Sequence, residues 1–206
     1  MAPSRGRGLA LGLSLSALVA CSSDLVAPGK EDKAPFDFAF TDPVADTLPP
    51  DASTPEGAGR GADLVGISGS VSADEVTLIL TFNEAVAPWS EGAPNSLDGV
   101  IDLDVDENLT TGIGDAATGG IGADYYLDLR DASSGTVSLV DVLERSFVFV
   151  PARFEGTTVT ITVPRSRLGG DDGEFAMTAL VGVRSRPVTD VAPETGSYQA
   201  HATGGS

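Results

Sequence analysis

The sequence predicts an all-β fold: a single antiparallel β-sandwich, jelly-roll or immunoglobulin-like, of about eight strands. Several short segments alternate apolar and polar residues with a period of two, which is typical of strands with one buried face. Turns that contain Gly or Pro separate these segments, and one long Pro/Gly-rich loop lies near the N-terminus. No run of ten or more residues after residue 21 shows a helical period, so we expect sheet rather than helix.

The N-terminal residues 1–20 are typical of a secretory signal peptide. Two arginines precede the apolar run 9–20, which is shorter than the roughly 20 residues that a membrane-spanning helix needs. The run ends at residues 18–21 (Leu-Val-Ala-Cys), which resemble a bacterial lipobox. The resemblance implies that the signal is removed before Cys21 and that Cys21 carries a lipid anchor. The alternative is an ordinary cleaved signal peptide followed by a chance cysteine.

Residues 21–35 are mostly small, polar and charged, which predicts a flexible tether between the membrane and the folded domain. Ser22 and Ser23 follow the cysteine, and by resemblance to lipoprotein sorting in double-membraned bacteria they favour the outer membrane. Cys21 is the only cysteine, so once lipidated it leaves no thiol for a disulfide or a catalytic nucleophile. We therefore expect a protein of the bacterial cell envelope, joined to the membrane through its lipid.

The chain is strongly acidic, with 12 Lys and Arg against 30 Asp and Glu and a net charge of −18. Binding to nucleic acid needs a basic surface, so this class of partner is excluded. Anionic lipid headgroups would also repel the domain, which leaves the membrane contact to the lipid. The charge suits a self-repelling, monomeric surface domain or one that collects cations.

We expect the β-sandwich domain to span residues 36–193 and a disordered tail to follow at 194–206. Phe36, Phe38 and Phe40 mark a first short strand, and the long loop covers 48–62. Further strand segments are expected at 64–71, 75–82, 136–142, 147–154, 157–163 and 175–183.

The most distinctive stretch is a predicted hairpin with a long loop, residues 99–130. On its first strand Ile101, Leu103 and Val105 alternate with Asp102, Asp104 and Asp106. The returning strand alternates in the same way through Tyr125, Leu127 and Leu129. Such a pair would gather its carboxylates at the Gly-rich loop between the strands.

Oxygen-bearing residues in this loop have spacings that suit calcium, which takes six to eight oxygen ligands. The candidate ligands are the side chains of Asp104, Asp106, Asn108, Asp115 and Asp124 and the backbone of Thr110. The loop is not an EF-hand, because Leu109 stands where that motif has Gly and because strands flank the loop. The alternative is a solvated acidic edge that prevents sheets from pairing edge to edge.

Four short stretches, in this order, resemble the DOMON-like and family-nine carbohydrate-binding-module group of bacterial β-sandwiches. They are Asp42-Pro43 with Asp46-Thr47, residues 101–106 (Ile-Asp-Leu-Asp-Val-Asp) with Thr111-Gly112, residues 122–125 (Gly-Ala-Asp-Tyr) and residues 163–169 (Val-Pro-Arg-Ser-Arg-Leu-Gly). The resemblance implies a β-sandwich that binds sugar, haem or calcium or serves as an accessory module. Haem is disfavoured, because the group's haem sites use Met and His and this chain has only Met177 and His201 after its signal segment.

The sequence favours a binding module over an enzyme. The single histidine lies in the expected tail, and neither zinc ligands nor a phosphate-binding loop before a helix is present. Trp89, in a proline-flanked loop, and Tyr126 are the candidate ligand-binding aromatics, although such a Trp can also cap the open end of a sandwich.

These observations predict a lipid-anchored cell-envelope binding or accessory module, without catalysis, that calcium stabilises. Its partner would be a polysaccharide or an envelope protein. The alternative function is a carbohydrate-binding module that uses Trp89 together with exposed Tyr and Asp residues.

Overall fold

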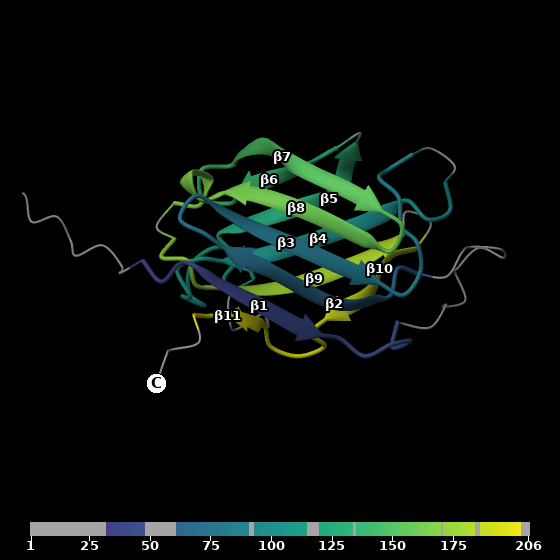
Figure 1. Ribbon diagram of the computed structural model, residues 1–206, viewed down its shortest axis with the longest axis horizontal. Helices are drawn as coiled ribbons and strands as arrows, with labels where there is room; N and C mark the ends of the chain where they lie inside the picture. The colour runs from purple at the N-terminus through teal and green to yellow at the C-terminus, as the bar shows by residue number, and fades with distance from the viewer. Residues whose placement is uncertain are drawn as a thin grey trace, which may run out of the picture.

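The computed structural model describes residues 32–47, 61–90, 93–114, 120–133, 135–169, 171–183 and 186–202. Within these ranges the protein is all-β and antiparallel, and its one helical element is the 3-10 turn η1, Arg165–Arg167. The described residues form eleven strands (Figure 1). They are β1 Phe36–Thr41, β2 Leu64–Val71, β3 Glu75–Phe82, β4 Leu97–Asp104, β5 Tyr125–Ser133, β6 Thr136–Asp141, β7 Ser146–Glu155, β8 Thr158–Pro164, β9 Phe175–Val183, β10 Arg186–Ala192 and β11 Tyr198–Ala200.

All strands belong to one sheet in the order β1-β2-β3-β8-β7-β6-β5-β4-β9-β10, with β11 also paired to β9. The long strand β7 joins two halves, because its first part pairs with β6 and its last part with β8. The sheet therefore folds over on itself, and β3 and β8 lie in front of β4 and β9 in Figure 1. Ring contacts between Phe38 and Phe175, and between Phe40 and Tyr198, bring β1 against β9 and β11. The result is a sheet that is nearly closed into a barrel.

The core lies between the two halves and follows the alternation in the sequence. In β3 the residues Val76, Leu78, Leu80 and Phe82 are buried, while the residues between them are only partly covered. In β8 the valines and the isoleucine are buried and the threonines are half-buried. Apolar side chains of β3, β4, β5 and β8 are fully or almost fully buried in this core: Leu78, Leu80, Leu103, Leu127, Val159, Ile161 and Val163. Because alternate side chains of a strand point to opposite faces, each strand delivers one row of apolar groups to the core.

The predicted all-β class is confirmed, but the expected strand number and the expected tail are wrong. Strands β10 and β11 were not foreseen, and β11 lies inside the segment 194–206 that we expected to be disordered. Tyr198 explains the difference: its ring stacks on Phe40 at 4.6 Å and its hydroxyl donates to Asp42 at 2.7 Å. These contacts, together with the pairing to β9, hold the strand in place.

The N-terminal predictions fall mainly outside the described residues. This is true of the signal segment, of Cys21, of most of the tether and of residues 48–60 of the long loop. The end of the expected tether contacts the domain, since Lys33 N donates to the Asp172 carbonyl at 2.7 Å and Arg165 pairs with Asp32 at 3.1 Å. In the described part of the chain no helix is long and apolar enough to cross a membrane.

Candidate metal centre

The predicted hairpin exists and places the acidic loop at one end of the sheet. Strands β4 and β5 are antiparallel, with Leu103 opposite Tyr125 and Ile101 opposite Leu127. Strand β4 ends at Asp104, two residues earlier than the alternation indicated. The chain then leaves the sheet at Val105 and returns through Asp124, whose N–H donates to the Leu103 carbonyl at 2.9 Å.

Three carboxylates meet where the loop leaves and rejoins the sheet. Asp104, Asp106 and Asp124 each offer an oxygen, and these oxygens lie within 4.8 Å of one another. Asp104 is fully buried and Asp124 is 5% exposed, whereas Asp106 is exposed. The group is therefore closed on its protein side and open to solvent at Asp106.

Backbone hydrogen bonds fix these carboxylates. One oxygen of Asp124 accepts from the N–H groups of Val105 at 3.1 Å and Asp106 at 3.2 Å. The N–H of Asn108 donates both to Asp104 Oδ1 at 3.2 Å and to Asp106 Oδ1 at 2.9 Å. The loop thus turns around the acidic group.

Burial makes this arrangement costly for a metal-free protein. Asp104 Oδ2 is buried and has no hydrogen-bond partner. Burial, followed by the nearby carboxylates, raises the pKa of Asp104 to about 7. Burial and the charge of Asp106 also raise the pKa of Asp124. A cation between the three groups would remove the repulsion and supply the missing partner of Oδ2.

The structure brings together three of the six predicted ligands. Asn108 Oδ1 accepts from both the N–H and the hydroxyl of Thr110, so these two residues close the turn on its exposed side. Asp115 lies outside the described residues. Asp102 lies on the same strand face as Asp104 but does not belong to the group of three carboxylates. Burial raises the pKa of Asp102 to about 6, and its side chain is hydrogen-bonded to Thr178.

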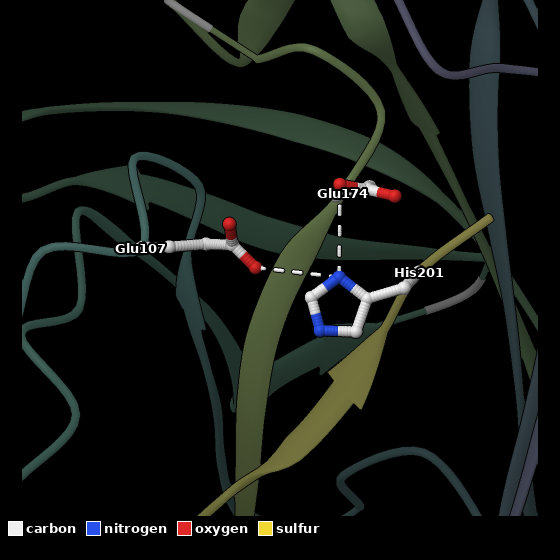
Figure 2. A group of neighbouring side chains, drawn as sticks. All are labelled: Glu107, Glu174 and His201. Carbon is white, nitrogen blue, oxygen red and sulfur yellow. Dashed lines mark ion pairs between the residues drawn. The ribbon is translucent and has the colours of Figure 1, made fainter. Parts of the chain in front are cut away.

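A second group beside the loop was missed because it depends on the C-terminal strand. Figure 2 shows Nδ1 of His201, just beyond β11, between the carboxylates of Glu107 and Glu174. The distances from Nδ1 are 3.6 Å to Glu107 and 3.7 Å to Glu174, so both become ion pairs when the imidazole is protonated. Sequence reasoning placed His201 in a free tail, and the only clue to its position was the aromatic Tyr198 three residues earlier.

The two predicted ligand-binding aromatics do not form one surface. Trp89 is 40% exposed, and its backbone N–H donates to the carbonyl of Ala132 near the end of β5. Tyr126 is half-buried near the start of the same strand, opposite Asp102 and Val140. Six residues of a strand separate Tyr126 from Ala132, which is about 20 Å. The most exposed rings of the described chain are instead Phe147 and Phe149 on β7, which contact each other edge to face at 5.6 Å.

A cavity of about 380 Å³ lies over the outer face of β4 and β9. Asp102, Thr178 and Leu180 line it from the sheet, and Ile121 and Glu194 line it from the flanking loops. None of its lining residues in the described chain is aromatic, so it lacks the ring on which a sugar would stack.

Comparisons with protein-family models, with curated protein sequences and with solved structures gave no match. The resemblance to the DOMON-like and family-nine carbohydrate-binding group therefore stays a prediction based on short motifs.

Proposed function

We propose that this protein is a calcium-binding, non-catalytic module of the β-sandwich kind that serves as a lipid-anchored binding or accessory domain of the bacterial cell envelope. The observation that carries the calcium assignment is Asp104, a fully buried carboxylate with an unpartnered oxygen that lies beside Asp106 and Asp124. An uncompensated buried charge costs free energy, and an ion that binds only the native state would recover it.

The chemistry of the group favours calcium over other metals. All three side chains offer hard carboxylate oxygens, whereas zinc sites in proteins are built mainly from Cys and His. The exposed side at Asp106 leaves space for the water ligands that complete a shell of six to eight oxygens. Magnesium demands a tighter octahedral shell and gives up its water reluctantly, so it should bind this group less well.

Calcium at this position would fasten the acidic loop to the end of the β4–β5 hairpin. Asp104 belongs to the sheet, Asp106 to the outgoing loop and Asp124 to the point of return. Extracellular calcium modules bind with dissociation constants of about 10⁻⁴ to 10⁻³ M, which suits a protein outside the cytoplasm. In this proposal the ion has a structural role: it gives the loop one conformation for contact with an envelope partner.

The calcium assignment is tested by melting the soluble domain in EDTA, in calcium and in magnesium. At a hundredfold excess over Kd, calcium should add about 2.7 kcal/mol, which raises Tm by several degrees. The double variant Asp104→Asn/Asp106→Asn should lose the contribution of the acidic loop to this shift. The matched control, Asp37→Asn/Asp74→Asn, removes two exposed acidic charges elsewhere and should keep the shift. Equal shifts with both ions, or an undiminished shift in the first variant, would leave only the solvated acidic edge.

The anchor assignment rests on the lipobox-like residues 18–21 and is tested separately. Cys21→Ser should block signal processing and abolish lipid labelling. Normal processing and membrane retention of that variant would contradict it.

A further inference from the structure

We propose that the protein has a second divalent-cation site, formed by Asp42, Asp46 and Asp190, which clasps the two edges of the nearly closed sheet. Each of the three carboxylates offers an oxygen within 4.8 Å of the others. Asp42 directly follows β1, Asp46 follows the next turn, and Asp190 belongs to β10. Strands β1 and β10 stand at the two ends of the strand order.

An orphaned buried oxygen marks the site. Asp42 is 6% exposed; its Oδ1 accepts from the Tyr198 hydroxyl at 2.7 Å, and its Oδ2 is buried without any hydrogen-bond partner. Asp190 is 3% exposed, and its Oδ2 accepts from the N–H of Leu64 at 2.6 Å. Two buried carboxylates are thus held against each other with free acceptor capacity between them, and a cation is the partner that satisfies both.

The surrounding chain holds the carboxylates together and adds negative charge. The N–H of Ala45 donates to both oxygens of Asp63, at 3.2 and 3.1 Å, which fixes the turn between Asp42 and Asp46. Asp63 and Glu194 both raise the pKa of Asp42 through their charges, in addition to the effect of burial. Among the described residues, no Lys, Arg or His forms an ion pair with Asp42, Asp46 or Asp190. Internal pairing within the described chain therefore does not neutralise the group.

The ligand set suits a calcium-sized ion. Its ligands are carboxylates from separate segments of the chain, and Asp46 is exposed, so water can complete the shell. At this position the ion would connect the segment that follows β1 with strand β10. These two strands stand at opposite ends of the strand order and do not pair with each other. It would add to the contacts that already cross this seam, the Asp190–Leu64 hydrogen bond and the stacking of Tyr198 on Phe40.

This site is independent of the acidic loop. Asp104 pairs with Ala176 near the start of β9, whereas Asp190 pairs with Val181 five residues further along the same strand. Five strand residues span about 17 Å, so one ion cannot serve both groups. The inference therefore does not rest on the calcium assignment at Asp104.

Calorimetric titration of the metal-free domain with calcium chloride counts the sites. The wild type should bind two ions, and the variants Asp42→Asn/Asp190→Asn and Asp104→Asn/Asp106→Asn should each bind one. If the wild type binds a single ion and Asp42→Asn/Asp190→Asn still binds it, the second site is overturned and the first is retained. If the wild type binds a single ion and Asp104→Asn/Asp106→Asn still binds it, the first site is overturned and the second is retained. The control Asp37→Asn/Asp74→Asn should bind as the wild type does.

Because Asp42 and Asp190 are buried, a milder variant guards against misfolding. Asp46→Asn changes an exposed ligand and should weaken calcium binding at this site at least tenfold while circular dichroism stays unchanged. Terbium emission gives a local readout of this site. The Tyr198 hydroxyl is hydrogen-bonded to Asp42, so the Tyr198 ring can sensitise a terbium ion bound there. Tyr198→Phe should remove the terbium emission that Asp46→Asn also removes, and Asp104→Asn/Asp106→Asn should leave that emission in place. Unchanged affinity in Asp46→Asn, or unchanged emission in Tyr198→Phe, would overturn the proposal.

Discussion

Replacing Asp104 by Asn should stabilise the metal-free protein and at the same time remove the part of its calcium response that arises at the acidic loop. The amide keeps the shape of the carboxyl group and can still accept the hydrogen bond from the N–H of Asn108. It carries no charge, so the cost of burying a carboxylate beside Asp106 and Asp124 disappears. The same change replaces a charged calcium ligand by a neutral amide, which holds calcium more weakly.

The magnitude follows from the pKa of Asp104, which burial and the neighbouring carboxylates raise from 3.8 to about 7. A shift of about three units, at about 1.4 kcal/mol per unit, corresponds to about 4 kcal/mol as an upper limit. Because the pKa is higher in the folded state than in the unfolded state, the folded wild type binds more protons between these two values. Its metal-free stability therefore falls as the pH rises from about 4 to about 7.

Urea unfolding in EDTA measures this effect. At pH 8 the variant should be more stable than the wild type by about 2–4 kcal/mol, and at pH 4 the difference should nearly vanish. In saturating calcium the wild type should recover, and the variant should gain less stability than the wild type because it lacks the contribution of the acidic loop. Asp37→Asn, an exposed control, should stay within about 0.5 kcal/mol of the wild type at both pH values. A variant that is less stable at pH 8, or equally stabilised at pH 4, would refute the reasoning.

Three further outcomes test other parts of the structure. Leu80→Ala, at a fully buried position of β3, should lower the free energy of unfolding by about 2–5 kcal/mol in urea melts, and a loss below 1 kcal/mol would contradict the described core. Gly112→Ala should destabilise the loop by more than about 1 kcal/mol and weaken calcium binding, because Gly112 has φ +62° and a Cβ there would collide with the backbone of Ala123. If the variant binds calcium as tightly as the wild type, the loop tolerates another path. If the protein binds polysaccharide through its exposed indole, Trp89→Ala should abolish retention on the insoluble polymer; retention by the variant would shift attention to Phe147 and Phe149.

Residues close in sequence determined the strands and the acidic hairpin. In β3 and β8 the period of two specified which side chains are buried, because a strand alternates its faces whatever the rest of the chain does. The β4–β5 pair could be predicted for the same reason, together with the Gly-rich loop that joins the two strands. Three of the six candidate calcium ligands follow directly from this local pattern.

The burial of Asp104 could not be read from the alternation. The pattern placed Asp104 on the same polar face as Asp102 and Asp106, yet the loop turns back over the strand end and covers it. The exposure of Asp104 therefore depends on the path of the loop. Hydrogen bonds from Val105 to Asp124 and from Asn108 to Asp104 fix that path, and the hydrophobic period of the sequence does not encode them.

Tertiary structure alone determined how the sheet closes. Strand β11 is short and is held by Tyr198, whose partners Phe40 and Asp42 lie more than 150 residues earlier in the chain. The group of Asp42, Asp46 and Asp190 likewise joins the two ends of the domain, and no local spacing connects them. The sequence by itself determined the strands with clear alternation, such as β3 and β8, because side-chain alternation is a local property. Which strand edges meet, and which carboxylates they bury together, is decided only when the sheet folds over at β7 and brings β1 back against β9 and β11.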